Sequence, residues 1–150
     1  MKKRDKIIAA GIAVIICVIS MYSFFHVAGQ EINGVKNISD TCTVTIIRYQ
    51  HMEYDERNEY VLDAGQIEQL KKLILESSFT RDLSYVVTFN DRDMYDIQID
   101  FNDHQNFISI HCIGNEYISV INQFNGKHLR INNPNWKESL EEIIKSTEAG

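Results

Sequence analysis

The side chains best able to do chemistry in this chain are aspartates in its second half. Five aspartates between residues 91 and 103 could in principle hold a calcium ion: Asp91, Asp93, Asp96, Asp100 and Asp103. An EF-hand loop that begins at Asp91 needs glycine at its sixth position and glutamate at its twelfth, where this chain has Asp96 and Asn102. A loop that begins at Asp100 has Gln105 where the glycine is needed. We therefore interpret these aspartates as turn residues and as the solvent side of a strand, with a non-standard calcium site between loops as the alternative.

Histidine and cysteine are too scattered for a standard zinc site. The candidates are His51, His104, His111, His128, Cys42 and Cys112. None has the H-E-x-x-H or paired C-x-x-C spacing, and neighbours in a strand such as His111 and Cys112 point to opposite faces. The chain also lacks a G-x-S-x-G nucleophile motif and a glycine-rich phosphate loop. The sequence therefore predicts no catalytic residue, no cofactor and no metal site. Cys42 and Cys112 are expected to be buried, and a disulfide between them is left open.

One group of polar residues is nevertheless expected to share a surface. Residues 94–101 alternate, so that Asp96, Gln98 and Asp100 face one way and the apolar residues between them face the other. The next hairpin should bring Ser109 and His111 beside them. The weak candidates for a surface site are Asp96, Asp100, His111 and His128, with Arg130, Phe107 and Tyr117 on the same face. Such a face could bind a cation, position a ligand or keep the sheet soluble. We favour solubility, which predicts that replacing Asp96 and Asp100 with asparagine leaves stability almost unchanged.

The elements that position these residues are strands and two helices. Strands are expected at residues 42–47, 60–62, 83–89, 94–101, 107–113, 117–121 and 127–131. A helix should begin after Asp63, with Gln66 completing a capping box, and a second after Asn133, with Pro134 in its first position. The fold class is α+β: one mostly antiparallel sheet of five to seven strands, with two helices packed on one face. That covered face should hold Ile97, Ile99, Phe101, Ile108, Ile110 and Cys112.

The N-terminal segment predicts a membrane anchor. Residues 7–29 contain no formally charged side chain, and the cluster Lys2-Lys3-Arg4 precedes them. By the positive-inside rule, residues 1–6 form a cytoplasmic tail, 7–29 a single transmembrane helix, 30–39 a linker and 40–150 an extracytoplasmic domain. The alternative is a signal peptide cut after Val27-Ala28-Gly29, which would release a secreted domain. We favour retention, because the apolar run is long.

Charge narrows the possible partners. Residues 30–150 carry 11 basic and 20 acidic side chains, a formal net charge of −9. A domain this acidic repels phosphate backbones, so nucleic acid is not an expected partner. The sequence also shows no basic patch for an anionic lipid surface. The expected partners are the lipid bilayer, through residues 7–29, and a protein or cell-wall component.

Several short segments carry a resemblance to known proteins: Phe79-Thr80-Arg81, residues 95–100, residues 116–119 and residues 132–136. They resemble small, uncharacterised membrane-anchored or secreted proteins of Gram-positive bacteria, over about residues 42–144. The resemblance implies an extracytoplasmic location and supplies no active site. We therefore expect a non-enzymatic, membrane-tethered interaction module. The alternatives are an envelope enzyme or small-ligand carrier that uses the polar sheet face, and a sensor or immunity-type protein acting through its transmembrane helix.

Overall fold

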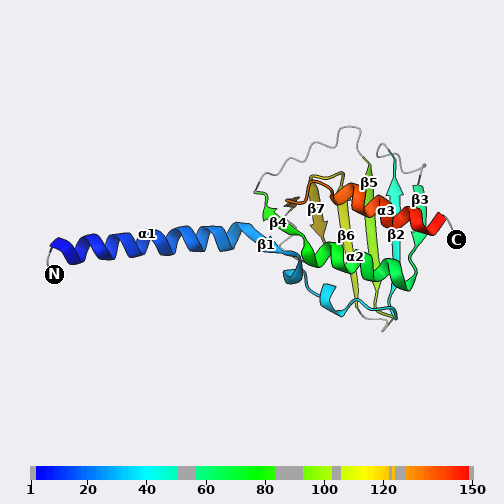
Figure 1. Ribbon diagram of the computed structural model, residues 1–150, viewed down its shortest axis with the longest axis horizontal. Coiled ribbons are helices and arrows are strands. Elements are labelled where there is room, and N and C mark those ends of the chain that lie inside the picture. Colours follow the sequence, from blue (N-terminus) through cyan, green and yellow to red (C-terminus); the bar gives the residue numbers. More distant parts are fainter. Residues whose placement is uncertain are drawn as a thin grey trace.

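A computed structural model describes residues 3–50, 57–83, 93–102, 106–121, 123 and 128–148 (Figure 1). In chain order the elements are α1 (Lys3–Phe25), β1 (His26–Ala28), η1 (Gly29–Glu31), η2 (Val35–Asn37), β2 (Thr43–Tyr49), β3 (Arg57–Val61), α2 (Ala64–Glu76), β4 (Ser78–Arg81), β5 (Met94–Asp100), β6 (Phe107–Ile113), β7 (Tyr117–Val120), β8 (Leu129–Ile131) and α3 (Trp136–Glu148). The helix α1 extends away from a domain that contains all the strands.

The strands form one antiparallel sheet in the order β1-β4-β8-β7-β6-β5-β2-β3. The edge strand β1 lies next to α1, and β3 lies at the opposite edge. The α+β class and the antiparallel sheet are thus confirmed, but the described residues contain eight strands, where five to seven were predicted. The sequence predicts β1 as part of the membrane helix, because its three residues continue a run without formally charged side chains. The strand after α2 is Ser78–Arg81; Leu83 is not in a strand, and residues 84–89 of the prediction lie outside the described residues.

Both domain helices pack on the same face of the sheet (Figure 1). The predicted covered face is confirmed: Phe101 is half-buried, and the other five side chains, Ile97, Ile99, Ile108, Ile110 and Cys112, are buried. The capping box of α2 is also confirmed, since Asp63 Oδ1 accepts from the Gln66 amide and Gln66 Oε1 accepts from the Asp63 amide, both at 2.8 Å. The side-chain amide of Gln66 then donates to the Ile143 carbonyl (2.9 Å) and so joins α2 to α3.

The start of α3 differs from the prediction by two residues. Asn133 Oδ1 accepts from the Asn135 amide at 3.0 Å, so Asn133 closes a turn that contains Pro134 and Asn135. The helix begins at Trp136, and the Asn135 carbonyl accepts from the Ser139 amide at 3.0 Å. The Asn133-Pro134 pair therefore lies in the turn before the helix and not in its first turn.

The predicted boundaries at the N-terminal side are wrong. The helix α1 ends at Phe25, and residues 30–39, expected as a linker, belong to the domain. Val27, Ile32, Val35 and Ile38 are each at most 1% exposed, and Lys71 Nζ donates to the Ile38 carbonyl at 2.8 Å. The segment has a linker's polar composition, but its three apolar side chains recur every third residue and fill the end of the core. The domain therefore begins at His26, directly after α1.

The apolar part of α1 has the dimensions of a membrane span. Among the described residues, Ile7–Phe25 is the one helix long and apolar enough to cross a bilayer, and none of it is buried. Its 19 residues give a length of roughly 28 Å, close to the hydrocarbon thickness of about 30 Å.

Candidate functional site

The face of the sheet opposite the helices carries large exposed apolar side chains. Phe107 is 65% exposed, and Val61 and Ile121 are also exposed. Beside Phe107 lies a hollow of about 510 Å³, which we call the open-face hollow. Its lining residues are Thr43, Thr45, Asp96, Gln98, Ile99, Asp100, Phe107, Ser109, His111 and Ile121. Apolar side chains around a few fixed polar groups are the usual composition of a ligand site.

The strand register explains which side chains meet in the hollow. Across the β5–β6 ladder, Asp96 pairs with His111, Gln98 with Ser109, and Asp100 with Phe107. Side chains of directly opposite residues lie on the same face of an antiparallel pair. Three strands, β2, β5 and β6, thereby contribute polar side chains to one surface, and Phe107 stands at its end.

Asp96 is the most firmly held polar group of the hollow. Its side chain accepts hydrogen bonds from Ser109 Oγ at 3.0 Å and from Gln98 Nε2 at 2.9 Å. His111 Nδ1 lies 3.4 Å from Asp96 Oδ1, and the two form an ion pair when the imidazole is protonated. Asp96 is 8% exposed, so the expectation that it belongs to a solvated strand face is wrong. Its neighbours on β5 and β6 bury it while they satisfy its oxygens.

The other predicted site residues are placed differently. Asp100 lines the same hollow and is exposed, and its Oδ1 accepts from the Asn102 amide at 2.8 Å. His128 does not line the hollow; it precedes β8, and its carbonyl accepts from the Asp82 amide at 3.1 Å. Asp91, Asp103, His51 and His104 lie outside the described residues. Within the described part of the chain, no group of three or more His, Cys, Asp or Glu side chains could hold a metal ion.

The two cysteines of the domain are buried free thiols. Burial raises the pKa of the Cys112 thiol to about 12, so it is uncharged and a poor nucleophile at neutral pH. The alternative of a Cys42–Cys112 disulfide is therefore not realised in this structure.

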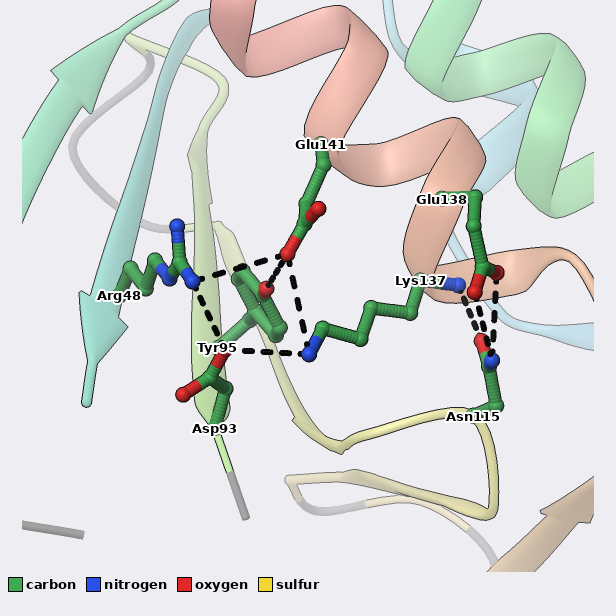
Figure 2. Close-up of polar contacts among 7 residues, drawn as sticks. All are labelled: Arg48, Asp93, Tyr95, Asn115, Lys137, Glu138 and Glu141. Carbon is green, nitrogen blue, oxygen red and sulfur yellow. Dashed lines mark hydrogen bonds and ion pairs between the residues drawn. The ribbon is translucent and has the colours of Figure 1, made fainter. Parts of the chain in front are cut away.

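A second polar cluster lies between α3 and the sheet (Figure 2), and sequence reasoning did not identify it. Asp93 Oδ2 contacts Arg48 Nη2 at 2.8 Å and Lys137 Nζ at 3.1 Å. Tyr95 donates its hydroxyl proton to Glu141 Oε1 at 2.8 Å, and Glu141 also lies 3.6 Å from Arg48. Burial alone would raise the pKa of Asp93, but the hydrogen bonds from Arg48 and Lys137 outweigh burial and bring it below its usual value.

The charges of this cluster balance, two basic side chains against two acidic ones, and each has an opposite partner. On the same helix, Glu138 accepts from Asn115 Nδ2 at 3.2 Å, and the Lys137 amide donates to Asn115 Oδ1. These contacts fasten the first turns of α3 to β2, to β5 and to the turn between β6 and β7. We assign the cluster a structural role and take the open-face hollow as the candidate site.

The burial of Asp96 predicts a difference between two aspartates that the sequence treats alike. Asp96→Asn replaces one carboxylate oxygen with an amide nitrogen that can no longer accept from Gln98 or Ser109, so one of these hydrogen bonds is lost or reversed, and we expect a loss of about 1–2 kcal/mol of unfolding free energy. Asp100→Asn keeps its Oδ1 acceptor on an exposed side chain and should change stability by less than about 0.5 kcal/mol. Urea unfolding of both variants measures the difference. Equal midpoints would mean that Asp96 is solvated after all.

Comparisons of the chain with protein-family models, curated proteins and solved structures found no significant match. The class of the protein therefore rests on the fold itself: an α+β domain with one antiparallel sheet, joined without a linker to an N-terminal helix that is long and apolar enough to span a membrane.

Proposed function

We propose that this chain is a single-pass membrane protein whose domain lies outside the cytoplasmic membrane and binds a partner protein through the open-face hollow, without catalysis. The observation that carries the proposal is a one-sided sheet: both helices pack on one face, while the other has a hollow lined by the ordered carboxylate of Asp96 and by the largely exposed Phe107. Solubility alone does not explain the exposed side chains of Phe107, Val61 and Ile121. Apolar side chains with a polar surround are typical of binding surfaces.

Two observations support a retained anchor. The basic residues of the chain's first six positions precede the apolar span Ile7–Phe25, which favours a cytoplasmic N-terminus. The alternative cleavage site, Val27-Ala28-Gly29, lies within the folded domain: β1 pairs with β4, and Val27 is 1% exposed. Cleavage after Gly29 would remove an edge strand and part of the core, so the fold favours an anchor over a signal peptide.

Charge indicates the kind of partner. The domain has a formal net charge of −9, and the hollow holds two carboxylates, Asp96 and Asp100. A lysine or arginine of a partner would find carboxylate oxygens there and an aromatic ring beside them, and both attract cations. We therefore propose that the partner surface is basic at its centre.

A specific contact favours one alternative, an envelope enzyme. A carboxylate that orients a histidine through Nδ1 is the base–orienter pair of many hydrolases, and Asp96 Oδ1 lies 3.4 Å from His111 Nδ1. Ser119 pairs with His111 across the β6–β7 ladder, but among the described residues no hydrogen bond joins their side chains. Without a nucleophile in contact with the histidine, binding is the better-supported function.

Substitution of Phe107 tests the proposal. We expect Phe107→Ala to weaken capture of a partner from solubilised membranes at least about tenfold, as substitution of an aromatic hot spot does. Asp100→Lys should act in the same direction by repelling a basic surface. The matched control is Leu83→Ala, an exposed apolar side chain that does not line the hollow. A partner captured equally by all four proteins would contradict binding through this face.

A further inference from the structure

The sheet has an exposed edge at the end opposite the anchor. Among the described strands, β3 has a neighbour on one side only, β2 (Figure 1). Its pairing with β2 is continuous over five residue pairs, without a bulge. The chain's single proline is Pro134, so no proline interrupts the strand. Bulges and prolines commonly prevent further strands from pairing with an edge, and β3 has neither.

The register of the β2–β3 pair shows which backbone groups of β3 face outward. The Leu62 amide donates to the Val44 carbonyl at 2.9 Å, so these two opposite residues form a hydrogen-bonded pair. Hydrogen-bonded pairs alternate along an antiparallel ladder with pairs whose amides and carbonyls point away from each other. Three residues of β3 therefore direct their amides and carbonyls away from the sheet: Arg57, Glu59 and Val61.

The side chains of the same three residues lie on the open face. Val61 is opposite Thr45, which lines the open-face hollow, and opposite residues of an antiparallel pair share a face. Arg57 and Glu59 alternate with Tyr60, which packs against the core on the other face. All three outward residues are exposed, Val61 at 58%. The β3 edge therefore continues the surface of the proposed binding site.

A second copy of the chain in the same membrane does not fit this edge. Figure 1 shows that α1 leaves the domain at the β1 edge and extends away from β3. If two sheets joined through β3, their β1 edges would lie at opposite ends of the combined sheet, and the two α1 helices would point in opposite directions. Two helices in this arrangement cannot both cross one bilayer. The occupant that fits is a strand from another protein.

We propose that the β3 edge binds an extended segment of the partner protein, which adds to the sheet as a further antiparallel strand. The inference rests on the tether and the open-face binding of the proposed function, and it adds how the partner is held. In strand addition, backbone hydrogen bonds supply affinity and alternate side chains supply specificity.

The side chains of β3 predict the sequence pattern of that segment. Opposite charges attract in cross-strand pairs, so the segment should carry an apolar residue opposite Val61, a basic residue opposite Glu59 and an acidic residue opposite Arg57. Because the added strand runs antiparallel to β3, these residues follow one another in that order at every second position. Charges on an edge discourage pairing with other strands. Here they restrict the edge to segments with this pattern.

The test measures binding of two synthetic peptides to the full chain in dodecyl maltoside micelles, by fluorescence anisotropy. The first, Thr-Val-Thr-Lys-Thr-Glu-Thr, has the expected pattern. The second, Thr-Val-Thr-Glu-Thr-Lys-Thr, has the same composition with the charges exchanged. We expect the second to bind at least about fivefold more weakly, because both charged pairs become repulsive.

A pair of variants tests whether the backbone of β3 takes part. Glu59→Ala and Glu59→Pro remove the same charge, but only Glu59→Pro removes the outward amide proton. Proline is tolerated in an edge strand where its nitrogen faces away from the sheet, so the pairing of β3 with β2 can persist. We expect the first peptide to bind Glu59→Pro at least about fivefold more weakly than Glu59→Ala, because one backbone hydrogen bond is lost.

The results that overturn strand addition are distinct. Equal binding of the two peptides, equal binding by the two variants, or no binding to the wild type would each contradict it. If Glu59→Pro does not fold, the comparison of the two peptides decides. Self-association of the wild type that Glu59→Pro abolishes would assign the edge to a second copy instead. Phe107→Ala leaves the β3 edge intact, so reduced partner capture by that variant, with no peptide binding, would retain the open-face function and exclude only the added strand.

Discussion

Replacing Trp136 with alanine is expected to destabilise the domain by about 3–5 kcal/mol, the usual cost of deleting a large aromatic side chain from a core. Trp136 is 0% exposed at the start of α3, and its ring meets the ring of Phe79 edge-on, with 5.8 Å between ring centres. Phe79 belongs to β4, so this contact joins the last helix to the half of the sheet nearest α1. A loss of this size is a large share of the stability of a small domain.

Chemical denaturation followed by circular dichroism measures this loss, because the substitution removes the only tryptophan. Phe107→Ala is the matched control: it deletes an aromatic ring of similar size from an exposed position and should change the unfolding free energy by less than about 0.5 kcal/mol. If the two variants unfolded at the same denaturant concentration, Trp136 would not pack in the core as described.

The second large effect is expected at Gly29, where the chain passes from β1 into η1. A Cβ atom at this position would lie 1.7 Å from the Ile74 carbonyl oxygen and 2.7 Å from its carbon. Both atoms belong to the backbone of α2 and cannot rotate away as a side chain can. The Gly29 amide also donates to the Ser77 carbonyl at 2.9 Å, which holds the two segments together. We expect Gly29→Ala to cost about 3 kcal/mol or more, because the segments must separate.

Gly11 provides the control for this substitution. A Cβ atom there has nothing within 4 Å, so Gly11→Ala should leave the domain's unfolding midpoint unchanged. A midpoint for Gly29→Ala equal to that of the wild type would show that residues 26–38 do not pack against α2. Residues 30–39 would then be the linker that the sequence predicts.

The faces of the sheet and the start of α2 could be predicted because each depends on local patterns. Alternation along residues 94–101 assigns Ile97 and Ile99 to the core, and the Asp63–Gln66 pair specifies a helix start within four residues. Strand β1 could not be predicted, since three residues that continue a run without formally charged side chains carry no signal of their own. Its pairing with β4 makes it a strand.

The candidate sites depend on contacts between distant residues. Nothing near Asp96 in the sequence indicates burial, which follows from the position of Ser109 opposite Gln98 in the β5–β6 register. The exposed Phe107 had a usable signal: it is an apolar residue on the polar face of a strand, opposite Asp100.

Protease treatment of intact protoplasts tests the central proposal most directly, because binding through the open face requires a tethered domain outside the membrane. External protease should remove the domain, while a fragment containing α1 stays in the membrane fraction and a cytoplasmic marker survives. A domain protected until the protoplasts are lysed would contradict the proposed orientation. A domain released into the medium with Gln30 as its first residue would contradict the tether.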